Sequence, residues 1–88
     1  MCTYHTEFAE ISGSGKGRDG WVSLSTATVY FDHPVHALAA HTLNIDFADA
    51  ASGPSGRIAV ELTAGSARAL VGAIERALAG VPADLLAE

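Results

Sequence analysis

Residues 41–62, HTLNIDFADAASGPSGRIAVEL, contain two short stretches in which apolar and polar side chains alternate. Their apolar members are Leu43, Ile45, Phe47, Ile58, Val60 and Leu62. Successive side chains of a β-strand point to opposite faces, so this period of two predicts strands with one covered face. The segment between them is rich in Gly, Ser, Pro and Asp, which is typical of a turn. The stretch therefore predicts two neighbouring antiparallel strands, at residues 41–48 and 57–62.

Two more strands are expected before this hairpin, at residues 3–11 and 21–31, where Thr, Val, Tyr and Phe are frequent. The Gly/Ser-rich segment 12–20 between them is typical of a flexible hairpin loop. Within 21–31 the apolar residues change parity after Leu24, which predicts a β-bulge near Ser25–Thr26.

A helix is expected after the last strand, at residues 64–79. Its apolar residues recur at helical spacing, and they are Ala67, Leu70, Val71, Ile74 and Leu78. Thr63 is suited to the N-cap position and Gly80 to the position after the last turn. The predicted fold is therefore α+β, a four-stranded antiparallel meander with one C-terminal helix packed on one face. We expect a single domain over residues 1–82 and a flexible tail over 83–88.

Composition limits the classes of partner. The 88 residues include 49% hydrophobic and 17% charged residues, with a formal net charge of −5. This charge argues against nucleic acid or an anionic membrane as partner, and no stretch has the ~20 apolar residues of a membrane span. The amino terminus lacks the pattern of a secretory signal, which predicts a cytoplasmic protein. One cysteine forms no internal disulfide, and a chain this short often pairs with a second copy, so a homodimer is expected.

Histidine and cysteine are confined to two stretches, 2–5 and 33–41. If the first two strands pair so that partner numbers sum to 32 or 33, Cys2 lies opposite Tyr30 or Phe31. The next pairing places His33 opposite His41. Antiparallel pairing therefore predicts that the two stretches meet at one end of the sheet, beside the start of the helix.

Such a cluster is typical of a transition-metal site, and zinc binds four ligands drawn from Cys, His and carboxylates. The predicted metal ligands are Cys2, His33, His36 and His41, with His5 or Asp32 as a substitute. A bound ion with an open position could act on a small molecule as a metal-dependent enzyme. Two alternatives stay open: a metal-free enzyme using histidine as general acid or base, and a dimeric interaction module with structural histidines. Asp46 and Glu61 lie at polar positions of the two neighbouring strands at 41–48 and 57–62. They could act as paired carboxylates, or each could be a solvated strand residue.

Three motifs carry a resemblance to a known family: MCTYHTE at residues 1–7, SGSGKG at 12–17 and ATVYFDHPVHA at 27–37. With HTLNIDF at 41–47, the chain resembles a family of short actinobacterial proteins classed as a domain of unknown function. The resemblance covers nearly the whole chain and implies a single-domain cytoplasmic bacterial protein without an assigned activity. It favours Cys2, His33, His36 and His41 over His5 as ligands.

Overall fold

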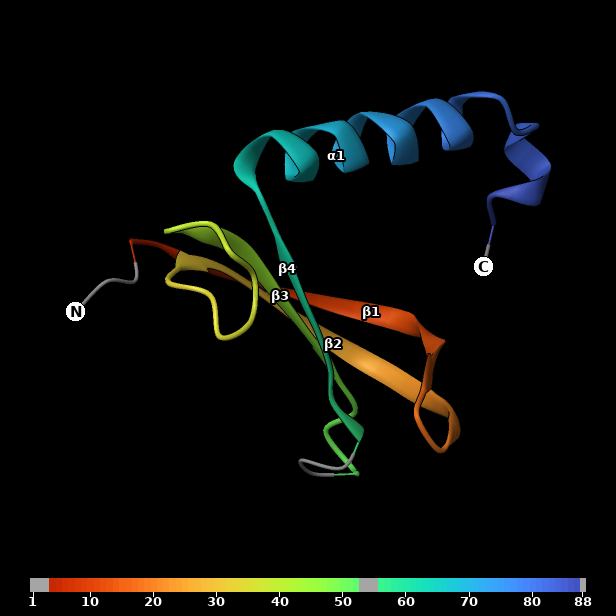
Figure 1. Ribbon diagram of the computed structural model, residues 1–88. Coiled ribbons are helices and arrows are strands. Elements are labelled where there is room, and N and C mark those ends of the chain that lie inside the picture. The colour runs from red at the N-terminus through yellow and green to blue at the C-terminus, as the bar shows by residue number, and fades with distance from the viewer. Residues whose placement is uncertain (1–3, 53–55, 88) are drawn as a thin grey trace.

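Four antiparallel strands followed by one helix form the protein, whose computed structural model describes residues 4–52 and 56–87 (Figure 1). The strands are β1 (Thr6–Gly17), β2 (Gly20–Asp32), β3 (Thr42–Ala48) and β4 (Ile58–Leu62), in the order β1-β2-β3-β4. They are followed by helix α1 (Ala64–Ala79) and the short 3-10 helix η2 (Ala83–Leu85). The predicted α+β meander is confirmed.

The register between strands gives the sheet two chemically different faces. Asp32 pairs with Thr42 at one end of the β2–β3 ladder, and Leu43 pairs with Leu62 between β3 and β4. Paired residues share a face, so the central apolar face is formed by Ala27, Val29, Phe31, Leu43, Ile45, Phe47, Ile58, Val60 and Leu62. The opposite face is formed by Thr28, Tyr30, Asp32, Thr42, Asn44, Asp46, Ala59 and Glu61.

The first hairpin differs from the prediction. Strand β1 continues through the Gly/Ser segment to Gly17, so the expected loop at 12–20 shrinks to the turn at Arg18–Asp19, and Gly20 takes a φ of 122°. Thr6 pairs with Tyr30, so partner numbers sum to 36 rather than 32 or 33. Residues 12–17 have no large apolar side chains, so their sequence gives no strand signal. A small residue is needed at position 15, because a Cβ at Gly15 would stand 2.7 Å from Cδ1 of Ile58.

The β-bulge lies on the strand opposite the predicted one. The register shifts between Glu10 and Gly13 of β1, across from Leu24–Thr26 of β2. The change of apolar parity in β2 therefore predicted the correct position of the bulge along the β1–β2 ladder, but the extra residue lies in β1.

Helix α1 begins where Thr63 caps it: the Oγ1 of Thr63 accepts a hydrogen bond from the backbone N–H of Ser66 at 3.2 Å. The helix packs against the sheet through β3 and β4 and passes above the apolar face (Figure 1). It covers that face incompletely, because Val71 and Ile74 remain 57% and 51% exposed. Among the described residues, Ala27 is the only buried apolar one, so the single chain has a thin core. None of the described helices is long and apolar enough to cross a membrane.

The cap gives a direct test of how the helix starts. We expect Thr63→Ala to lower the free energy of unfolding by about 1 kcal/mol, because the N–H of Ser66 loses its acceptor. Urea unfolding followed by circular dichroism at one fixed protein concentration measures this loss. Thr63→Ser keeps the hydroxyl and serves as the control. Equal losses in both variants would contradict the capping role.

Candidate functional site

The loop between β2 and β3, residues 33–41, is anchored to the polar face of the sheet by Glu61 of β4. The carboxylate of Glu61 accepts hydrogen bonds from the backbone N–H groups of Val35 (2.5 Å), His36 (3.0 Å) and Ala37 (2.8 Å). Because Glu61 pairs with Asn44 across the β3–β4 ladder, the loop must pass over the end of β3 to reach it. The loop is therefore a folded cap on the sheet rather than an open connection.

Two polar residues at this end of the sheet are buried. Thr42 is 0% exposed and Asn44 is 5% exposed, and the hydroxyl of Thr42 donates a hydrogen bond to Oδ1 of Asn44 at 2.6 Å.

Three donated hydrogen bonds stabilise the ionised form of Glu61, so its pKa lies below the ordinary value. The N–H of Val35 is the largest contributor, followed by that of Ala37. The anchor is thus a carboxylate held in its charged form.

The side chains of His33 and His41, the first and last residues of this loop, form a stacked pair. Their ring centroids lie 4.5 Å apart, with an angle of 30° between the ring planes. The Nδ1 of His33 lies 3.0 Å from the carbonyl oxygen of Ala40, and a carbonyl oxygen only accepts, so Nδ1 carries the proton. Whenever this imidazole is neutral, its Nε2 retains a free lone pair.

Two aromatic rings adjoin the His33–His41 pair. Phe31 stacks on His41 at a centroid distance of 5.9 Å, and the Tyr4 ring lies 6.3 Å from that of His41. The backbone N–H of Tyr4 also donates to the carbonyl oxygen of Phe31 at 3.4 Å. The chain that enters the sheet from the amino terminus therefore runs next to the histidine pair.

Four of the five predicted ligand residues lie among the described residues. As expected from the strand pairing, the rings of His33 and His41 lie against each other. His36 contributes its backbone N–H to Glu61, and the exposed imidazole of His5 contacts the carboxylate of Glu7. Cys2 lies outside the described residues, and within 4–52 and 56–87 no three His, Cys, Asp or Glu side chains gather closely enough to hold a metal ion. The complete ligand set remains a prediction.

A polar cavity of about 320 Å³ opens on the polar face of the sheet. The residues that line it include Tyr30, Asp32, His33, Asn44, Asp46, Arg57 and Glu61. Asp46 organises it: its carboxylate accepts from the Tyr30 hydroxyl at 3.2 Å and from Nη2 of Arg57 at 2.6 Å. Burial, followed by the charge of Asp46, raises the pKa of Tyr30. Asp46 and Glu61 thus have different hydrogen-bond partners, and neither is simply a solvated strand residue.

The Tyr30–Asp46–Arg57 cluster was not foreseen as a unit. All three residues had the parity of the polar face, and Tyr30 lies diagonal to Asp46 across the β2–β3 ladder. Once the register is known, this parity is the signal that would have found the cluster.

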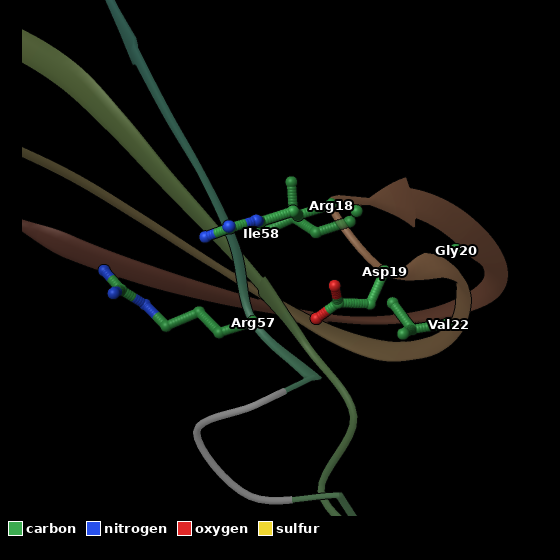
Figure 2. A pocket seen from close by; sticks show the side chains of 7 residues that line it. Arg18, Asp19, Gly20, Val22, Arg57 and Ile58 are labelled. Carbon is green, nitrogen blue, oxygen red and sulfur yellow. The ribbon is translucent and has the colours of Figure 1, made fainter.

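A second cavity, of about 200 Å³, lies at the tip of the first hairpin. Figure 2 shows Arg18, Asp19 and Val22 of the hairpin beside Arg57 and Ile58. The turn lies at the opposite end of the sheet from the 33–41 loop (Figure 1). This cavity is therefore separate from the histidine pair.

These features define a small α+β protein whose single antiparallel sheet carries a helix over its apolar face and a histidine-containing cap on its polar face. The model of a family of unknown function, DUF6295, matches residues 1–87, and the chain belongs to this family. No curated protein and no solved structure matches the chain. The family resemblance expected from the sequence is thereby confirmed.

The anchor gives a prediction for the loop. In Glu61→Gln we expect amide hydrogen exchange at residues 35–37 to accelerate at least about tenfold, because a neutral amide accepts more weakly than a carboxylate. Exchange measured by NMR at neutral pH tests this, and the amides of the separate 49–52 turn are the internal control. Unchanged protection at 35–37 would contradict the anchoring role.

The lowered pKa of Glu61 also fixes the direction of a pH effect in the unmodified protein. A carboxyl whose folded pKa is depressed contributes its full stabilisation above its unfolded pKa and loses it as pH falls through the folded pKa. We therefore expect protection at 35–37 to be constant near neutrality and to fall only in acid. Glu61→Gln should lack this acid-dependent step, and a step of equal size in the variant would contradict the assignment.

Proposed function

We propose that this protein binds a transition metal ion, with zinc as the first choice, through the imidazoles of His33 and His41. The observation that carries the proposal is the ring pair itself, 4.5 Å between centroids, with Nδ1 of His33 bound to a backbone carbonyl. Histidines that ligate metals usually donate their second ring nitrogen in this way, which fixes the tautomer and orients the lone pair.

The spacing of the rings suits a common ion. Zinc–nitrogen bonds of about 2.0–2.1 Å at a tetrahedral angle place two ligating nitrogens about 3.3 Å apart. Rings with centroids 4.5 Å apart are near enough for one ion to contact both, and because ring lone pairs lie in the ring planes, both side chains must rotate out of the stack to converge on it.

Cys2 is the proposed thiolate ligand. It precedes Tyr4 by two residues, and two residues of extended chain span at most about 7 Å. Since Tyr4 is hydrogen-bonded to Phe31 and its ring adjoins His41, the thiol has the reach to contribute. A thiolate ligand also suits the cytoplasmic location that the sequence predicts, where cysteines stay reduced. His5, His36 and Asp32 are the other candidates for the remaining positions.

A second candidate function rests on the same imidazole. His33 lines the polar cavity with Tyr30 and Asp46, so its Nε2 could exchange a proton with a small molecule bound there, without a metal. The two functions differ in whether ligand binding needs the ion.

Metal titration of the full chain, purified without an affinity tag, tests the first proposal. We expect one zinc ion per chain, and a cobalt-substituted protein with a thiolate charge-transfer band. His33→Ala and His41→Ala should each weaken zinc binding at least about 100-fold, since each removes a direct ligand. Glu75→Ala, at an exposed position in the C-terminal half of α1, is the control, and its zinc affinity should change little.

Two results would overturn the metal site: absence of stoichiometric zinc binding, or equal losses of zinc affinity in Glu75→Ala and His33→Ala. The second candidate is tested on chelator-treated protein by screening small molecules for shifts of the Tyr30 and His33 NMR resonances. NMR shift changes that occur without added metal and are lost in Asp46→Asn would favour the second candidate.

A further inference from the structure

The apolar face of the sheet and the inner side of α1 enclose an open groove. It has a volume of about 320 Å³, and its lining includes Val29, Leu43 and Ile45 of the sheet and Leu70, Val71 and Ile74 of the helix. The helical residues are each about half exposed. Apolar patches of this kind on a soluble chain mark surfaces that are covered by another molecule.

The accessible surface of the chain is too large for a compact monomer. It measures 6,669 Å² for a mass of 9.0 kDa, whereas a folded monomer of this mass exposes about 4,900 Å². The radius of gyration is 14.5 Å, against about 12 Å for a compact domain of this length. The excess is therefore about 1,800 Å² per chain.

This excess has the size of a dimer interface. If each of two chains buried half of it, the interface would total about 1,800 Å², a standard value, and full burial would give about 3,600 Å², in the range of obligate homodimers. The interior of the single chain is thin, because Ala27 is the only buried apolar residue among those described. A second subunit would supply the missing core.

The charges around the groove are compatible with a second copy of the chain as its occupant. Each chain carries a net charge of −5, so two copies repel each other over most of their surface. Arg68 is the only charged residue among the described residues that line the groove, so this face can meet its own copy without opposing carboxylates. A two-fold interface brings the same patch of both subunits together, and the apolar lining of this groove suits such a contact.

We infer that the protein is a homodimer in which the Leu70–Val71–Ile74 side of α1 from each subunit enters the groove between α1 and the sheet of the other. The inference is independent of the proposed metal site, which lies in the 33–41 loop region.

Sedimentation of the full chain tests the dimer. We expect a species of twice the 9.0 kDa chain mass across the micromolar range. Ile74→Asp should raise the dissociation constant at least about 30-fold, because it places a charge in the apolar interface. Ala69→Asp, which adds the same charge to the opposite side of the same helix, should leave it unchanged. A monomeric wild type, or equal effects of the two variants, would overturn the inference.

A second measurement remains decisive if Ile74→Asp fails to fold. In a mixture of isotope-labelled and unlabelled wild-type chains, we expect intermolecular NOEs between the methyl groups of Ile74 or Leu70 and those of Val29 or Ile45. A dimer that shows intermolecular NOEs only at other surfaces would overturn the assigned interface.

Discussion

The register of β2 on β3 is the constraint on which the rest of the molecule depends. Asp32 pairs with Thr42 and Ala27 pairs with Phe47, and every residue between them is paired in step. Because side chains alternate with a period of two, a slip of one residue would move Leu43 and Ile45 to the polar face. The loop leaves and rejoins the sheet at the Asp32–Thr42 pair, and the rings of its first and last residues, His33 and His41, stack on each other. The faces and the histidine pair therefore share one cause.

The cap formed by residues 33–41 is held on the sheet by hydrogen bonds. Its backbone N–H groups at 35–37 are bound by Glu61, and the buried Thr42 and Asn44 bind each other. Within the described chain, no buried side-chain nitrogen or oxygen lacks a hydrogen-bond partner. Since an unpaired buried polar group costs about 1–3 kcal/mol, this pairing lets a polar loop lie on the sheet. Polar contacts thus stabilise one side of the sheet, and apolar contacts with α1 stabilise the other.

The sequence alone predicts those elements whose side-chain pattern reflects the backbone conformation. Strands β3 and β4 and helix α1 followed from clear periodicity, and the proximity of His33 and His41 followed from the antiparallel pairing of the strands that flank their loop. The pattern failed in β1 beyond Ile11, where glycine and serine give no periodic signal, although backbone pairing with β2 extends the strand. Because the turn length was misjudged, the predicted β1–β2 register was wrong as well.

The anchor of the loop was also beyond the reach of pattern analysis. Glu61 contacts backbone groups that are at least 24 residues away in sequence, and backbone N–H groups carry no residue-specific signal. The same holds for the groove beside α1: periodicity identified the apolar side of the helix, but not how closely that side approaches the sheet. Such distances depend on the tertiary packing of the whole chain.

The bulge between Glu10 and Gly13 affects how the sheet meets other sheets. Strand β1 pairs only with β2, so its outer edge carries hydrogen-bonding groups that could template a further strand. The extra residue interrupts the regular β1–β2 ladder, and β1 also carries the charged residues Glu7, Glu10 and Lys16. Both features oppose growth of the sheet by edge-to-edge addition, the route by which exposed strands assemble into fibrils. The irregularity in β1 therefore protects a long outer strand from aggregation.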